Sequence, residues 1–138
     1  MFFKTKAIFF DIGGVVVDAN LQSYADLGAK MFQTDPDSIR KAAAHLVPDF
    51  ECGRMSSHNF WKLIETSLWS LGIGKADKDR DLDAVWRDLL KDSITVNFEV
   101  VKMAEELREK YTVGVLSNAI KDHVTLLQKL KVYDGFDP

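Results

Sequence analysis

The chain has 138 residues, with 18 Lys and Arg against 21 Asp and Glu, a formal net charge of −3 and 46% hydrophobic residues. This length suits a single domain, and the hydrophobic content excludes an intrinsically disordered chain. The mild acidity, without a Lys/Arg stripe, argues against nucleic acid as a partner. No run approaches the roughly 20 apolar residues of a membrane span, and one cysteine fits a reducing compartment. We therefore expect a cytoplasmic protein without a membrane partner.

The N-terminal part predicts a buried strand that ends in a carboxylate. Residues 7–10 are a continuous apolar run, Ala-Ile-Phe-Phe, which is typical of a parallel strand covered on both faces. The run stops at Asp11, which argues against a secretory signal peptide. Gly13 and Gly14 follow, and then Val15–Val17, which predicts a short β excursion that closes in a turn.

The middle of the chain, from about residue 21 to residue 94, has helical periodicity. Asp35-Pro36 predicts the start of a helix that covers 37–46. Ser56 or Ser57 predicts the start of another helix, which ends at Gly72 and Gly74. The cleanest amphipathic pattern is that of Leu82, Val85, Trp86, Leu89 and Leu90. We expect a helical bundle here, with Trp61, Trp69 and Trp86 in its core.

The C-terminal part returns to alternating elements. Asn97 predicts the start of a helix with Val100, Val101, Ala104 and Leu107 inward, and 112–116 predicts a second apolar strand that ends at Ser117-Asn118. A last helix carries Val124, Leu127 and Leu130. The order is strand, helical insertion, helix, strand, helix, which predicts an α/β fold with an inserted helical subdomain.

Polar side chains follow both predicted strands at their carboxyl ends, where open parallel sheets bind ligands. Asp11 could act as a nucleophile or hold Mg²⁺, and Gly13 and Gly14 leave backbone N–H groups accessible to phosphate. Ser117 and Asn118 could bind the same phosphate. Each residue also has a simpler interpretation: Asp11 as a turn former, the glycines as a turn, and Asn118 as a cap of the last helix. The set as a whole favours phosphoryl transfer.

The segment from Phe9 to Asp18 resembles the first motif of the haloacid dehalogenase-like (HAD) hydrolase superfamily, and Val115-Leu116-Ser117-Asn118 resembles its second. Glu51–Ser56 resembles the cap turn of the sugar-phosphate phosphatase-like branch. The resemblance implies a Rossmann-like parallel-sheet core, incomplete here, in 1–17 and 96–138, and a helical cap in 18–95.

The resemblance also implies roles for the residues at these motifs. Asp11 would be the nucleophile and a Mg²⁺ ligand, and the carbonyl of Gly13 would be a second ligand. Gly13, Gly14, Ser117 and Asn118 would bind the phosphoryl group. The complete protein would then be a Mg²⁺-dependent phosphatase that acts on a small phosphorylated metabolite through an aspartyl-phosphate.

Two departures from the family pattern leave alternatives open. Gly13 stands where these phosphatases usually carry an acid/base Asp, which keeps a hydrolytic dehalogenase possible. The family's Lys motif and acidic pair do not follow Ser117-Asn118, and Lys121, Lys129 and Lys131 fit a solvated face. We therefore expect a truncated chain with an incomplete Mg²⁺ site that is inactive by itself, or a non-catalytic remnant or interaction module. We also expect the open edge of 7–11 to favour self-association.

Overall fold

The computed structural model describes residues 4–18, 23–74 and 79–138. The described residues form two compact units. Unit 1 comprises 4–18, 94–119 and 123–138, and unit 2 comprises 23–74, 79–93 and 120–122. The domains expected from the sequence, 1–17 with 96–138 and 18–95, stay a prediction, because a compact unit is not by itself an independently folding domain. The predicted start of the first helical stripe, at residue 21, lies outside the described residues.

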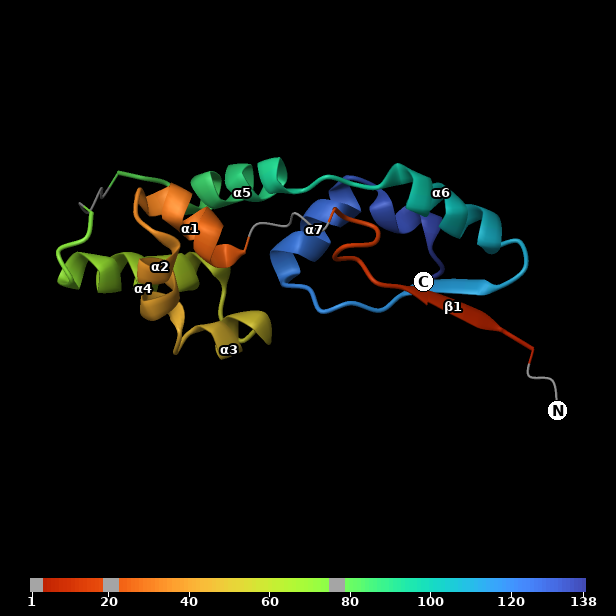
Figure 1. The fold of residues 1–138 in the computed structure, drawn as a ribbon, viewed down its shortest axis with the longest axis horizontal. Coiled ribbons are helices and arrows are strands. Elements are labelled where there is room, and N and C mark those ends of the chain that lie inside the picture. Colours follow the sequence, from red (N-terminus) through yellow and green to blue (C-terminus); the bar gives the residue numbers. More distant parts are fainter. Residues whose placement is uncertain (1–3, 19–22, 75–78) are drawn as a thin grey trace. The chain divides into compact units, whose positions relative to one another are not determined.

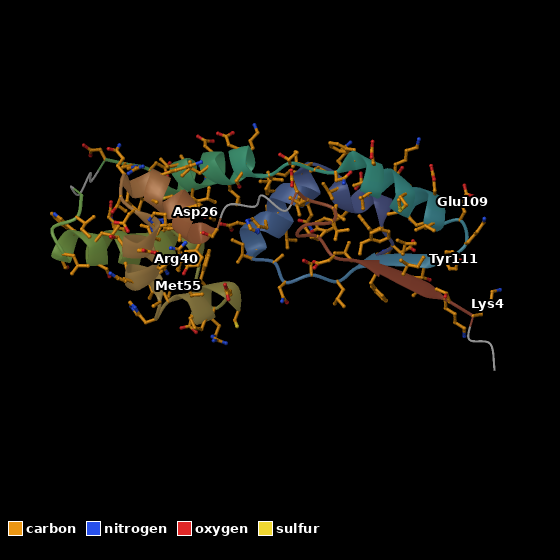
Figure 2. All side chains as sticks on the ribbon, viewed as in Figure 1. Lys4, Asp26, Arg40, Met55, Glu109 and Tyr111 are labelled. Atoms are coloured by element: carbon orange, nitrogen blue, oxygen red, sulfur yellow. The ribbon has the colours of Figure 1, made fainter. Side chains whose placement is uncertain are left out.

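Unit 1 is built around a parallel pair of strands (Figure 1). Its elements are β1 (Ala7–Phe10), α6 (Phe98–Leu107), β2 (Thr112–Val115), most of α7 (Lys121–Lys129) and a 3-10 turn, η1 (Val132–Gly135). The register pairs Ala7 with Thr112 and Phe10 with Val115. Lys4 and Tyr111 lie just before the starts of the two strands (Figure 2). The fold is thus α/β with a parallel sheet, as predicted.

One face of the sheet carries the core of unit 1. Val113 is fully buried there, and Phe10 and Val115 pack against the same cluster. The buried members of this cluster are Ile12, Val16, Val17, Val101, Ala104, Val113, Leu127, Val132 and Phe136. Alternation along a strand sends the neighbouring side chains to the opposite face. The core of unit 1 is therefore one-sided with respect to the sheet.

The prediction that both faces of the first strand are buried was wrong. Ala7 is exposed and Phe9 is 63% exposed, whereas Ile8 and Phe10 are half-buried. The apolar run hides this alternation because its exposed positions are apolar as well. The second strand is also shorter than expected, since it ends at Val115 and leaves Leu116 74% exposed.

Helix α6 begins where the sequence predicted. The side chain of Asn97 accepts the N–H of Val100 at 3.4 Å. Val101 and Ala104 are buried, while Val100 and Leu107 are partly buried against the same core. The predicted inward stripe of this helix is confirmed.

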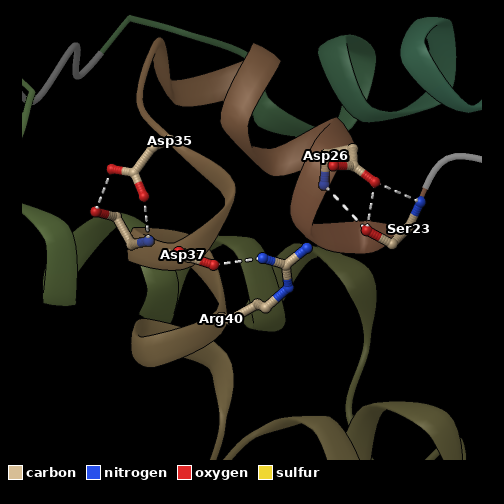
Figure 3. Close-up of polar contacts among 6 residues, drawn as sticks. Ser23, Asp26, Asp35, Asp37 and Arg40 are labelled. Carbon is tan, nitrogen blue, oxygen red and sulfur yellow. Dashed lines mark hydrogen bonds and ion pairs between the residues drawn. The ribbon is translucent and has the colours of Figure 1, made fainter.

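Unit 2 contains five helices among its described residues: α1 (Tyr24–Phe32), α2 (Pro36–Ala43), α3 (Val47–Glu51), α4 (Ser57–Ser70) and α5 (Leu82–Ser93). Local capping explains four of the starts, and at α5 the side chain of Asp81 accepts the N–H of Ala84 at 3.0 Å. Ser23 and Asp26 form a reciprocal capping box at α1, and Asp35 accepts the Ser38 N–H at 2.9 Å at α2 (Figure 3). Ser56, rather than Ser57, caps α4. The inserted segment is helical, as predicted, although α2 ends at Ala43 and the short α3 was not expected.

An aromatic cluster fills the core of unit 2. Phe60 and Trp61 are fully buried, Phe60 stacks on Phe50 with ring centroids 4.0 Å apart, and Trp61 lies 4.9 Å from Trp86. Trp69 is 55% exposed, so its predicted place in the core was wrong. It follows Leu68, which is 2% exposed and continues the buried stripe of α4, so Trp69 lies about 100° around the helix from that stripe.

None of the described helices is long and apolar enough to cross a membrane. The longest, α4, has 14 residues.

Candidate active site

The parallel register brings the two predicted motifs to the same end of the sheet. Phe10 pairs with Val115, and the N–H of Leu116 donates to the carbonyl of Phe10 at 3.0 Å. Asp11 follows one strand directly, and Ser117 follows the other after a single residue. Because parallel strands end at a common edge, both motifs leave the sheet there, where α/β folds bind ligands. The structure thus brings together the segments that carry the predicted site residues.

Asp11 is an exposed carboxylate that its own backbone orients. Its Oδ1 accepts the N–H of Ile12 at 2.7 Å. A carboxylate has about four lone-pair sites, so this single bond leaves acceptor capacity for a cation or for attack on phosphorus. Ile12 is buried in the core of unit 1, which fixes the backbone beside the carboxylate.

A tight turn follows Asp11. The N–H of Gly14 donates to the carbonyl of Val17, and the N–H of Val17 donates to the carbonyl of Ile12, each at 2.8 Å. These two bonds flank Gly13 and do not use its own N–H or carbonyl. Gly14 has φ +76°, a left-handed conformation that favours glycine. The turn therefore presents the backbone groups of Gly13, which is exposed, next to the carboxylate.

The far side of the turn is anchored in the core of unit 1. Val16 and Val17 are almost completely buried. The N–H of Asn97 donates to the carbonyl of Val16, and the N–H of Asp18 donates to the carbonyl of Thr95, each at 2.8 Å. The sequence analysis missed this support, because bonds between backbone groups so distant in the chain leave no residue-type signal. The anchoring ties the Val16–Asp18 end of the turn to the Thr95–Asn97 segment that precedes α6.

The second motif lies in an irregular segment between β2 and α7. Ser117 is half-buried and Asn118 is exposed. Helix α7 begins at Lys121, so Asn118 stands too early in the chain to be its N-cap. This removes the simplest structural explanation for Asn118. The roles of Asp11, Gly13, Gly14, Ser117 and Asn118 in binding or catalysis stay predictions.

The donors near Asp11 fit a magnesium ion only in part. Magnesium prefers six oxygen ligands and keeps several waters, with one or two protein carboxylates. Asp11 and the carbonyl of Gly13 offer oxygen donors of the right kind. Over 4–18, 23–74 and 79–138, no group of three or more His, Cys, Asp or Glu residues could hold a metal. A magnesium ion at Asp11 would therefore take most of its ligands from water or phosphate.

The cap-turn segment, Glu51–Ser56, lies in unit 2 and is well ordered by local bonds. Gly53 has φ +72°, and the Nε of Arg54 donates to Oδ1 of Asp49 at 2.8 Å. This ion pair holds the pKa of Arg54 above its usual range. The Arg54 guanidinium is thus already paired with a carboxylate of helix α3.

The chain resembles known proteins at the level of solved structures. No family model matches it, and no curated protein matches it. Among solved structures, it is similar to a HAD family enzyme from Bacteroides thetaiotaomicron, solved as the wild-type protein in complex with magnesium and inorganic phosphate. The TM-score is 0.65 at 22% identity, over 91% of this chain and 59% of that enzyme. A second structure of the same enzyme gives 0.65 at 19% identity, over 91% and 58%.

These likenesses show the fold. The chain has the fold of HAD family enzymes, as the motifs predicted, and it spans slightly less than three fifths of the length of the enzyme it matches.

Proposed function

From the HAD-like fold, we propose that the complete protein is a Mg²⁺-dependent phosphatase that acts on a small phosphorylated metabolite, with Asp11 as its nucleophile. The observation that carries the proposal is the common sheet edge, since Asp11 and the Ser117-Asn118 segment leave adjacent parallel strands there. A neighbour of the same fold was solved with magnesium and inorganic phosphate, which supports phosphate chemistry at this fold.

In the first step, a free oxygen of the Asp11 carboxylate attacks phosphorus. The ester P–O bond breaks, the alkoxide leaves and takes up a proton from solvent water, and an acyl-phosphate forms on Asp11. Ser117 and Asn118 donate hydrogen bonds to the phosphoryl oxygens, and the exposed N–H of Gly13 can donate as well. Bound Mg²⁺, held by Asp11 and the carbonyl of Gly13, would offset the negative charge on the phosphoryl group.

In the second step, water attacks phosphorus and the bond between phosphorus and the Asp11 oxygen breaks. This step regenerates the Asp11 carboxylate and releases inorganic phosphate. No side chain at residue 13 can donate a proton to the leaving group or activate this water. Such general acid/base groups contribute roughly 10²–10⁴-fold to rate. We therefore expect the enzyme to favour substrates with good leaving groups.

A second candidate is a non-catalytic interaction module. It is favoured by the glycine at position 13 and by the lack of a metal-binding cluster among the described residues. A hydrolytic dehalogenase, in which Asp11 attacks a carbon that bears a halide, stays an outcome that the same assays detect.

The test uses acetyl phosphate, because trapping the acyl-phosphate needs only the first step. The complete protein is incubated with acetyl phosphate and Mg²⁺, and intact mass spectrometry measures the addition of one phosphoryl group. We expect a mass gain that Asp11→Asn abolishes and that the control Asp88→Asn, an exposed carboxylate on α5, keeps. Peptide mapping should place the group on Asp11.

Phosphate release from p-nitrophenyl phosphate and halide release from a 2-haloacid are measured in parallel. Halide release that depends on Asp11 would replace the phosphatase proposal with the dehalogenase. If there is no phosphoryl gain, no phosphate release and no halide release, the non-catalytic candidate is supported instead.

A further inference from the structure

The segment that carries the second motif is held at both of its ends. At the strand end, the N–H of Leu116 donates to the carbonyl of Phe10 at 3.0 Å. At the other end stands Asp122, in the first turn of α7. Five residues separate Leu116 from Asp122. Because the reach of so short a segment is limited, fixing both ends restricts where the side chains of Ser117 and Asn118 can lie.

The carboxylate of Asp122 is bound by side chains of two other helices. Trp86 Nε1, on α5, donates to Asp122 Oδ2 at 2.7 Å, and the hydroxyl of Ser57, at the start of α4, donates to the same oxygen. Trp86 is buried, and Asp122 and Ser57 are half-buried. Hydrogen bonds to a charged acceptor are stronger than those between neutral groups. Asp122 is therefore fixed by residues that lie 36 and 65 positions away in the chain.

The grouping of the chain into compact units reflects these bonds. Ile120–Asp122 group with unit 2, which contains Ser57 and Trp86, whereas the residues just before and just after them group with unit 1. An acidic residue in the first turn of a helix also stabilises that helix end by itself. That simpler role needs no side chain from another helix, and Asp122 has two. The contacts therefore indicate a role for Asp122 beyond the start of its own helix.

We propose that Asp122 is a positioning residue for the second motif. Its bonds to α4 and α5 hold the helix end of the segment after β2, so that Ser117 and Asn118 meet the phosphoryl group. Asp122 itself does not touch the substrate. This inference rests on the proposed function, in which Ser117 and Asn118 bind phosphate. Displacing the two donors weakens phosphate binding and slows transfer, because hydrogen bonds depend steeply on distance and angle.

Binding of inorganic phosphate to the complete protein in the presence of Mg²⁺ tests the proposal by isothermal titration calorimetry. Asp122→Ala removes the acceptor, whereas Asp122→Asn keeps one carbonyl oxygen that can accept from both Ser57 and Trp86. We expect Asp122→Ala to raise the dissociation constant of phosphate at least about tenfold and Asp122→Asn to leave it within about threefold. In the hydrolysis of p-nitrophenyl phosphate, kcat of Asp122→Ala should fall by up to about 100-fold.

The matched control is Asp83→Ala, which removes a polar contact between the same two helices. Asp83 lies on α5, and its Oδ2 is 3.1 Å from Nδ1 of His58 on α4. Neither residue belongs to the segment after β2. We expect the phosphate affinity and kcat of this variant to stay within about twofold of the wild type, since an exposed ion pair contributes little. Circular dichroism checks that each variant is folded at the assay temperature.

A double-variant cycle tests the same bonds from the donor side. Trp86→Phe and Ser57→Ala each remove one donor, and each stays informative if Asp122→Ala does not fold. We expect each to weaken phosphate binding, and Trp86→Phe combined with Asp122→Ala to weaken it no more than Asp122→Ala alone. Additive losses would show that Trp86 and Asp122 act independently and would overturn the assignment.

The remaining outcomes separate this inference from the proposed function. Ser117→Ala and Asn118→Ala are measured in the same assay. If both weaken phosphate binding and Asp122→Ala does not, the phosphate site stands and the role of Asp122 is wrong. If neither weakens it, the phosphate site is wrong, and both proposals fall. Equal losses in Asp122→Ala and Asp83→Ala would show a general destabilisation and would also overturn the positioning role.

Discussion

Asp137 occupies the position of a neighbouring strand beside Val113. Its N–H donates to the carbonyl of Val113 at 2.6 Å, and its carboxylate accepts the N–H of Val113 at 2.7 Å. The Nε of Arg108 donates to the other carboxylate oxygen at 3.0 Å. A single residue thereby satisfies both outward backbone groups of a buried strand position.

We expect Asp137→Asn to lower the thermal unfolding midpoint. The Asn side chain has one neutral oxygen acceptor in place of two charged ones. It therefore cannot accept from both the Val113 N–H and Arg108, and the charge assistance of both bonds is lost. Thermal denaturation followed by circular dichroism measures the change. The control is Asp134→Asn, because Asp134 contributes only its backbone carbonyl to Arg108, at 3.0 Å. An equal loss in both variants would contradict the role of the Asp137 carboxylate.

The same contact predicts a pH dependence of stability. The bond from Val113 and the guanidinium of Arg108 hold the pKa of Asp137 below its ordinary value of 3.8. A depressed pKa contributes stability that is present above the unfolded value and is lost as pH falls through the folded value. We expect the difference in unfolding free energy between the wild type and Asp137→Asn to be constant at neutral pH and to shrink below about pH 4. Urea denaturation across this range measures it, and a difference that grows on acidification would contradict the assignment.

We expect Gly28→Ala to destabilise unit 2, although alanine favours a helix. A Cβ at this buried position in α1 would lie 2.9 Å from Ile39 Cγ2 and 2.9 Å from Trp61 Cζ3. Overpacking costs about 1–3 kcal/mol, against about 1 kcal/mol of helix propensity gained. Chemical denaturation should show a net loss. Trp61→Phe removes the atom in contact, so the double variant should lose less than the sum of the single variants. Strict additivity would show that the steric contact is not the cause.

Two buried tryptophans of unit 2 differ in the environment of the indole N–H. Trp61 Nε1 is buried without a hydrogen-bond partner, whereas Trp86 Nε1 donates to Asp122 Oδ2 at 2.7 Å. Both substitutions by Phe remove similar apolar area. We expect Trp61→Phe to cost about 1–2 kcal/mol less than Trp86→Phe, because the first removes an unsatisfied donor and the second breaks a bond. Urea denaturation compares them directly, and equal losses would contradict this difference.

The helix starts could be predicted because they depend on neighbours in the chain. Asp35 and Asn97 each accept an N–H from three residues ahead, which is a local pattern of residue types. The positions of Asp11 and Ser117 after apolar runs could be predicted for the same reason, and the parallel pairing of the two strands followed from their order. Apolarity alone could not tell which face of β1 is covered, because the exposed positions are apolar too.

What the sequence by itself determined is thus the order of elements, their caps and the two polar motifs at the strand ends. The tertiary structure decided the open face that leaves Phe9 and Leu116 exposed, the attachment of Asn97 to Val16 and the pairing of Asp137 with Val113. These contacts join segments distant in the chain, and they depend on register and direction rather than on residue type. Capping and periodicity act within a turn or two of the backbone, whereas a strand edge is covered by whichever distant segment reaches it.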